Sequence, residues 1–167
     1  MVESATPTYY AVCVLNSSTG VTGTVKFVQT HGQKVRIQAE LAGLAPGLHG
    51  FHIHEFGNLT NGCVTAGPHY NPFGQVHAGP NDEIRHVGDL GNVEAKEDGK
   101  ATYDAEDRLI NIYGDSANIV GRSVVVHGGV DDLGKGGNEE SLKTGNAGAR
   151  VACGVIGVSG PFELTKL

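Results

Sequence analysis

Six of the eight histidines in this chain, together with one aspartate, are the residues best suited to chemistry. Imidazole is the commonest biological metal ligand, and carboxylate oxygens also bind metals. Seven such donors are too many for one ordinary four-coordinate site, and they suit two metals that share a ligand. The candidate donors are His52, His54, His69, His77, His86, Asp89 and His127.

One residue separates His52 from His54 in the segment GFHIHEFG. Side chains at positions i and i+2 of a strand project from the same face, so the two imidazoles would form a stiff chelating pair. An isolated His-x-His pair is more often one core and one surface histidine. The other candidate donors are what favour a metal-binding role for this pair. His49 is expected on the opposite face as a hydrogen-bonding residue, and His31, in a turn, is expected to be exposed.

The second cluster of donors lies in GPHYNPFGQVHAGPNDEIRHVGD. Its three imidazoles and one carboxylate, from His69, His77, His86 and Asp89, can complete a tetrahedral zinc shell. Because catalytic zinc usually keeps an open position, four protein ligands indicate a structural or electrostatic zinc. The alternative is a solvated polar loop, and the strand pair and His127 weigh against it.

His127 ends the apolar run VVVH, where a strand would hold its ring rigidly. Together with His52, His54 and His69 it would supply an all-nitrogen tetragonal set, a geometry typical of Cu(II). His69 belongs to both sets, so it would bridge the two metals as an imidazolate. The ligand count favours this bridge, but sequence spacing alone leaves it open.

The frame that must hold these donors is predicted to be all-β. Short period-2 runs bounded by glycine and asparagine are strand signals, and short strands separated by turns favour a sandwich or small barrel. The closest approach to a helical period is ATYDAEDRLINI. The predicted strand runs are TYYAVCVLN, GTVKFVQT, KVRIQAELAG, GFHIHEF, RSVVVHGG and RVACGVIGVS.

Two longer stretches, roughly 56–89 and 128–150, interrupt this rhythm. Structureless loops beyond about 12–15 residues are uncommon unless they are functional or disordered. The first stretch contains four of the candidate donors, so it is expected to be a functional loop.

Length and composition favour one globular domain over residues 1–167, without repeat or linker. The 26 glycines lack a collagen period and indicate many turns. A formal charge of −6 argues against nucleic acid or anionic membrane as a partner. No apolar stretch approaches the ~18 residues needed to span a bilayer, and the N-terminus lacks a secretory signal, so a cytoplasmic location is expected. The final Thr-Lys-Leu is one residue from the peroxisomal address Ser-Lys-Leu, which leaves the peroxisome as an alternative.

Five segments, in order, resemble the copper–zinc superoxide dismutases, of the cytosolic type found in eukaryotes: GFHIHEFG, GPHYNP, IRHVGDLGN, DDLGKGGNEES and GNAGARVACGVIG. The resemblance covers about residues 10–158 and leaves a C-terminal tail, 159–167. It implies an eight-stranded Greek-key β-barrel or sandwich with a metal-binding loop and an electrostatic loop. It also implies disproportionation of superoxide to dioxygen and hydrogen peroxide by alternate reduction and reoxidation of copper. A homodimer loaded by a copper chaperone is the implied assembly.

The resemblance also assigns roles to residues. Copper would be held by His52, His54, His69 and His127, and zinc by His69, His77, His86 and Asp89, one ion of each per subunit. Asp131 matches the carboxylate that links His52 to His77, and Arg150 matches the arginine that holds superoxide beside copper. His69 would leave copper, take a proton and help return it. The implied channel residues are Lys135, Lys143, Thr144, Glu139 and Glu140.

The three cysteines do not have zinc-finger spacing, and a disulfide is uncommon in the cytosol, so the residues alone leave one pair open. The resemblance implies a bond between Cys63 and Cys153, which would contribute about 4–5 kcal/mol in the chain-entropy model. Cys13 would then be a buried free thiol. The implied dimer contacts are Phe56, Gly57, Val120, Gly121, Val155, Ile156 and Val158.

Gly128 and Gly129 depart from the family pattern, because many relatives carry there a charged pair that includes a channel-rim lysine. A weaker salt dependence of the rate is therefore expected. Two other functions remain open. A non-catalytic metal-binding or copper-delivery module with the same fold would typically lose copper ligands or the arginine, and a zinc hydrolase would need the open position that Asp89 would occupy.

Overall fold

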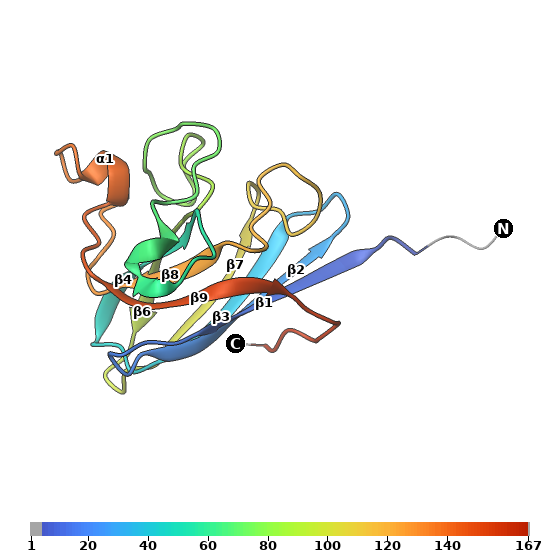
Figure 1. Cartoon of the computed structure of the whole chain (residues 1–167), viewed down its shortest axis with the longest axis horizontal. Helices are drawn as coiled ribbons and strands as arrows, with labels where there is room; N and C mark the ends of the chain where they lie inside the picture. The colour runs from blue at the N-terminus through green and yellow to red at the C-terminus, as the bar shows by residue number, and fades with distance from the viewer. Residues whose placement is uncertain (1–4, 167) are drawn as a thin grey trace.

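The computed structural model describes residues 5–166. Its antiparallel strands close into a barrel in the order β1-β2-β3-β7-β6-β4-β8-β9, which confirms the predicted eight-stranded all-β fold (Figure 1). The strands of the barrel are β1 (Thr8–Leu15), β2 (Thr22–Thr30), β3 (Val35–Ala42), β4 (Gly47–His54), β6 (Asp89–Ala95), β7 (Ala101–Asp107), β8 (Ser123–His127) and β9 (Arg150–Val158).

Alternating side chains explain why the barrel closes around one core. Phe27 on β2 lies opposite Ile37 on β3, and both are fully buried. Their sequence neighbours point outward, as the period-2 pattern predicts. Burying such apolar surface contributes roughly 25 cal/mol per Å² and is the main force that holds the strands together.

Strand β8 is the exception to this alternation, because all five of its residues are buried. The first long loop, residues 55–88, covers its outer face: Ala66 packs there with Val125 and Cys153. The run VVVH is therefore apolar on both faces, and His127 is held at the end of a strand enclosed on two sides.

The sequence patterns did not identify β6 and β7. The run ATYDAEDRLINI, which came closest to a helical period, forms β7 and the turn that follows it. Its period of two is visible in the exposed Thr102, Asp104 and Glu106, which alternate with more buried neighbours. Charged outer residues and few large apolar inner ones made the strand pattern weak.

Two crossovers give the barrel its Greek-key character. Strand β4 follows β3 in the chain but is separated from it by β7 and β6, and β8 follows β7 but lies on the far side of β4. These crossovers place β4 between β6 and β8. As a result, three strands that are distant in sequence can contribute side chains to one end of the barrel.

Both long loops contain short elements and lie on the same side of the barrel in Figure 1. The first includes β5 (Thr60–Cys63) and the 3-10 helix η1 (Val64–Ala66), and the second, residues 128–149, includes α1 (Ser141–Thr144). A disulfide between Cys63 and Cys153, 90 residues apart, fastens the first loop to β9, as expected. Cys13 is buried and free, which is also confirmed.

The C-terminal tail crosses the outer face of β1 to β3. The backbone N–H of Ser159 donates to the Tyr10 carbonyl at 2.9 Å, and Phe162 packs edge-on against Tyr10 at 5.2 Å between ring centres. Farther along, the Gln38 side chain donates to the Thr165 carbonyl at 2.6 Å. The last residue of the Thr-Lys-Leu sequence, Leu167, lies outside the described residues. Within residues 5–166, no helix is long and apolar enough to cross a membrane.

Candidate metal centre

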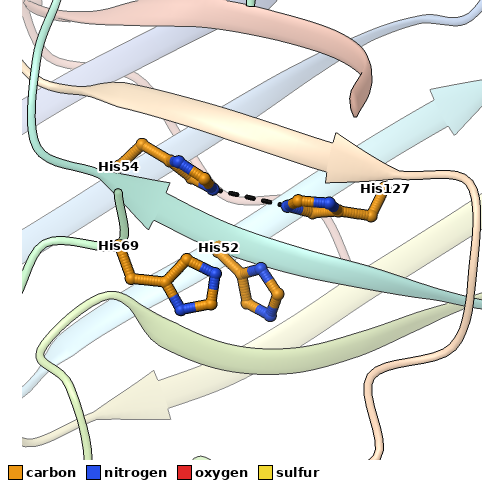
Figure 2. A group of neighbouring side chains, drawn as sticks. All are labelled: His52, His54, His69 and His127. Carbon is orange, nitrogen blue, oxygen red and sulfur yellow. Dashed lines mark hydrogen bonds between the residues drawn. The ribbon is translucent and has the colours of Figure 1, made fainter. Parts of the chain in front are cut away.

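Four imidazoles meet between β4, β8 and the first long loop (Figure 2). His52 and His54 extend from the same side of β4, as their spacing predicts, and His127 comes from the end of the adjacent β8. His69 comes from the loop, which is held against β4 by a hydrogen bond from the Tyr70 N–H to the Ile53 carbonyl at 2.8 Å. All four rings are buried, and they form one group that could hold a metal ion.

Backbone carbonyls orient two of these rings. The Nδ1–H of His54 donates to the Gly67 carbonyl at 2.8 Å, and the Nδ1–H of His127 donates to the Gly148 carbonyl at 3.0 Å. In each ring this leaves Nε2 as the nitrogen available to a metal, and the two Nε2 atoms lie 3.3 Å apart. Both glycines belong to the long loops, so the loops set the orientation of the imidazoles.

The other two rings carry the clearest sign that the group suits a cation. His52 Nδ1 and His69 Nε2 are buried and have no hydrogen-bond partner in the protein. Buried polar atoms are normally paired, so two orphaned nitrogens in one cluster call for an explanation. A copper ion held by His52, His54, His69 and His127 would give both atoms a partner, so the donor set fits this metal.

A second group shares His69 with the first. The Nδ1 atoms of His69, His77 and His86 lie 2.9, 2.8 and 3.2 Å from Asp89 Oδ1. The other oxygen of Asp89 accepts hydrogen bonds from the backbone N–H groups of Ala78 and His86, which fixes the carboxylate. Three imidazole nitrogens and one carboxylate oxygen match a closed tetrahedral zinc shell, so these residues fit zinc.

Asp131 connects the two groups. Its oxygens accept hydrogen bonds from Nε2 of His52 and Nε2 of His77, each at 2.7 Å. Asn92 on β6 holds the Asp131 backbone through two hydrogen bonds, of 2.8 and 3.0 Å. Sequence reasoning missed Asn92, although its place in GDLGN, three residues after Asp89, could have drawn attention to it.

Burial keeps the imidazoles of the first group unprotonated. Desolvation lowers the pKa of His52 to about 4, of His69 to about 3 and of His127 to about 4, and lowers the pKa of His54 well below its usual value. Only the neutral ring presents a lone pair to a metal. These side chains are thus in the form that binds a cation at neutral pH.

The second group is electrostatically different because it contains a carboxylate. Burial alone would lower the pKa of His77, but hydrogen bonds to Asp131 and Asp89 raise it to about 9. Burial acts to raise the pKa of both aspartates, yet hydrogen bonds from the histidines hold Asp89 far below its usual value and lower Asp131 to about 2. Two anionic carboxylates therefore face the imidazoles and favour a positive ion.

A cavity of about 1120 Å³ opens above the first group. His54, His69 and His127 contribute to its inner surface, and Arg150 lies beside them. The Arg150 guanidinium donates from Nη1 to the Cys63 carbonyl at 2.8 Å, so the disulfide-bonded loop positions this charge. A small anion that enters the cavity would meet both the guanidinium and the imidazoles.

A model of the family described as copper/zinc superoxide dismutase (SODC) matches residues 21–156. The chain belongs to this family. As a copper/zinc superoxide dismutase family member it is an oxidoreductase, and the metals implied by the family agree with the two donor groups.

The superoxide dismutase channel residues predicted from the sequence are only partly brought together. Lys143 and Thr144 line the cavity with Glu140. Lys135 and Glu139 do not line this cavity, so a steering role for either residue stays a prediction. The Lys135 backbone N–H donates to the Asp132 carbonyl in a tight turn, and its side chain is exposed. Glu139 instead pairs with Lys143 at 2.6 Å.

The expected dimer residues of the superoxide dismutase also need one correction. Ile156 is fully buried in the barrel core, because β9 alternates and Val155 takes the outward position. Phe56, Val155 and Val158 are exposed, whereas Val120 is partly buried against the core. A Cβ placed on Gly57 would lie 2.1 Å from the Gly121 carbonyl oxygen and 3.3 Å from Val155, so these three residues are neighbours.

The remaining histidines behave as predicted. His49 is buried, and its two ring nitrogens contact the carbonyls of His127 and Ala45 at 2.9 and 2.7 Å. His31 is exposed in its turn and stacks on Tyr113 at 4.9 Å. Neither residue joins a metal group among the described residues.

Proposed function

We propose that this chain disproportionates superoxide to dioxygen and hydrogen peroxide, with one copper and one zinc per subunit. Copper would be held by His52, His54, His69 and His127, and zinc by His69, His77, His86 and Asp89. The observation that carries the proposal is the orientation of His69, which turns Nδ1 toward Asp89 and leaves Nε2 buried without a partner on the other side. One ring would thereby offer a nitrogen to each metal.

A bound copper ion would supply one-electron exchange with superoxide, and zinc would supply fixed positive charge. His69 would hold a proton at Nε2 between the two half-reactions, since its Nδ1 is directed to the zinc side. Asp131 would keep His52 and His77 in their tautomers and orientations, because it accepts a hydrogen bond from each. His69 could thus take up and release a proton while the backbone and the neighbouring imidazoles stay in place.

Arg150 would bind the incoming anion. A guanidinium stays charged at all physiological pH values and presents several donors, which suits a small oxyanion. Its place on the cavity wall beside His54 and His127 supports this role. Lys143 and Thr144 would shape the entrance of the cavity, and the negative charge of Glu140 would modify the electric field there.

The closed zinc group weighs against hydrolysis as an alternative. Its four donors converge within one shell, and a hydrolytic zinc requires a position open to water. A non-catalytic copper module is also less favoured, because the copper set and Arg150 are all present beside an open cavity.

We also propose a homodimer, formed by the exposed apolar residues near Gly57 and Gly121, and a copper chaperone that loads the metal. The support is that Phe56, Val155 and Val158 are large apolar residues that are nevertheless 49%, 43% and 81% exposed. Exposed apolar residues that form a contiguous patch often mark an association surface.

The proposal is tested by superoxide decay in the presence of the full-length protein loaded with copper and zinc. We expect fast decay that is lost when copper is removed by a chelator, and lost in His127→Ala but retained in His31→Ala. Equal activity with zinc alone would overturn the proposal. Retained activity and copper content in His127→Ala under the same loading conditions would overturn the assignment of His127 as a copper ligand.

A further inference from the structure

Arg85 is a charged side chain with 0% of its surface exposed, and it lies directly before the metal-group residue His86. Its Nη1 donates to the carbonyl of Asp89 at 2.7 Å, with longer contacts to the carbonyls of His86 and Val87 at 3.3 and 3.4 Å. A single guanidinium therefore holds the backbone of the turn that presents both His86 and Asp89. The resemblance and the donor sets assigned it no role.

The other end of the guanidinium is anchored on a different element. Nη2 forms an ion pair with Asp107, which ends β7 and is 5% exposed. Asp107 Oδ1 in turn accepts hydrogen bonds from the backbone N–H groups of Leu109 and Ile110, at 2.7 and 3.0 Å. The turn of the zinc group is thereby connected through two side chains to the loop that follows β7.

A buried ion pair of this kind contributes little net free energy to folding. Removing two charges from water carries a large desolvation penalty, and an apolar pair of similar size is often as stable. Arg85 Nε is also buried without a partner, so the ion pair is not fully satisfied. Stability of the barrel alone does not explain why this pair is placed beside two zinc donors.

We propose that Arg85 and Asp107 are positioning residues that preset the His86–Asp89 turn for zinc. The inference rests on the zinc group of the proposed function. The guanidinium fixes the carbonyls of the turn, and Asp107 fixes the guanidinium, so that His86 Nδ1 and Asp89 Oδ1 are held at the separation seen in the structure. Neither residue bonds to His52, His54 or His127, and they reach the shared ligand His69 only through Asp89 and His86, so the effect should fall on zinc before copper.

The experiment compares zinc and copper release from the fully metal-loaded, full-length protein into excess chelator. Asp107→Asn keeps the acceptor for Leu109 and Ile110 but removes the charge opposite Arg85. The matched control is Asp104→Asn, which removes the same charge from the same strand, opposite the exposed Arg36. We expect Asp107→Asn to weaken zinc retention about 10- to 100-fold, the usual effect of losing an outer partner of a ligand, with copper retention and the control unchanged.

A second variant, Arg85→Lys, keeps the test usable if Asp107→Asn does not fold. Arg85→Lys keeps the charge, but its single ammonium lacks the planar fork that joins the Asp89 carbonyl to Asp107. It should also release zinc faster without releasing copper faster. Wild-type zinc release in both variants would overturn the proposal, as would equal acceleration of both metals, which indicates general destabilisation.

The wild-type protein offers a test that needs no substitution. Coupling between two sites is reciprocal, so zinc binding should tighten the Arg85–Asp107 connection. We expect zinc loading to slow hydrogen exchange at the amides of Leu109 and Ile110 by about 10-fold or more, and not at Gln33 in a turn elsewhere. Unchanged exchange at Leu109 and Ile110 would contradict the inference.

The two proposals fail in different ways. If the wild-type protein holds no zinc, or if His86→Ala retains it, the zinc assignment itself is wrong. If the wild-type protein holds zinc and His86→Ala loses it, while Asp107→Asn and Arg85→Lys behave as wild type, only the positioning role is wrong.

Discussion

At the residue scale, each imidazole of the proposed copper set has one nitrogen oriented by the protein. The fixed partners are the Gly67 and Gly148 carbonyls and the Asp131 and Asp89 carboxylates. The residue types and the His-x-His spacing predicted the donors. They could not predict which nitrogen faces the metal, because that depends on carbonyls and carboxylates contributed by other segments.

Arg150→Ala should lower the rate constant for superoxide decay about 10- to 100-fold, within the range by which a local field raises the rate of anion capture. The reason is that the cavity wall loses the positively charged guanidinium beside His127. Steady-state or pulse measurements of superoxide decay at equal copper content would check it. Arg36→Ala, which removes an exposed charge on β3, should leave the rate unchanged, and an equal fall in both variants would exclude a specific role.

Cys13 should not react with a thiol reagent in the folded protein. Burial raises its pKa to about 12, so the thiol stays protonated where an ordinary cysteine of pKa 9.0 begins to ionise, and the sulfur is also inaccessible. Thiol titration between pH 8 and 10 should find no reactive cysteine in the native protein, one after unfolding and three after unfolding with reduction. Three before reduction would contradict the Cys63–Cys153 bond.

At the element scale, the two long loops do the positioning that the strands cannot. The first loop supplies His69, His77 and His86, and the second supplies Asp131 and the Gly148 carbonyl. The sequence located both loops from their length and their donors. The alternation of apolar and polar residues is weak in β6 and β7, since these strands present charged or small side chains on the outside. The sequence therefore did not predict the strands that hold Asn92 and Asp107.

Gly128 and Gly129, at the start of the second long loop, give a prediction at this scale. A Cβ on Gly129 would lie 2.8 Å from the Ala147 carbonyl oxygen, whereas one on Gly128 would meet the Val151 side chain at 3.3 Å and the Ala149 carbonyl oxygen at 3.8 Å. Gly128→Lys is thus the tolerated way to restore a cation here, and it should steepen the fall in rate with ionic strength. Rates measured from low to high salt would show this.

The matched control for Gly128→Lys is Gly128→Gln, which has similar bulk and no charge. It should follow the shallow wild-type salt dependence. A wild-type dependence already as steep as that of the lysine variant would show that these glycines do not weaken steering.

At the scale of the whole molecule, the exposed apolar residues Phe56 and Val155 lie beside the neighbouring Gly57 and Gly121. The disulfide fixes this region, since it ties the first long loop to β9 near Val155. The same bond fixes the Cys63 carbonyl that holds Arg150. The Cys63–Cys153 disulfide would therefore hold both the proposed subunit contact and the anion-binding side chain of Arg150 in place.

Val155→Glu should weaken dimerisation about 100-fold or more, because an unpaired carboxylate buried at an interface costs several kcal/mol. Sedimentation equilibrium over a range of concentrations would measure it. Leu48→Glu is the matched control, since Leu48 is similarly exposed, at 41% against 43% for Val155, but lies on β4. A monomeric wild-type protein, or equal weakening by Leu48→Glu, would contradict the proposed surface.

We propose a cytoplasmic location in spite of the Thr-Lys-Leu sequence. The tail packs on the barrel, where the Thr165 carbonyl accepts a hydrogen bond from Gln38, and this contact limits its extension toward a receptor. A fluorescent reporter fused ahead of the full chain should give a diffuse signal. Punctate signal that overlaps a peroxisomal marker, and disappears on Lys166→Ala, would contradict this location.

The sequence by itself determined the donor types, the all-β class, the two functional loops and the family, because these depend on local spacing and on ordered motifs. Only the tertiary structure decided how the donors are used. Crossovers bring β4, β6 and β8 together, and loop carbonyls, Asp131 and Asp89 then select one nitrogen of each ring. Ile156 and Arg85 show the same limit, since the burial and partners of a side chain depend on contacts with segments distant in sequence.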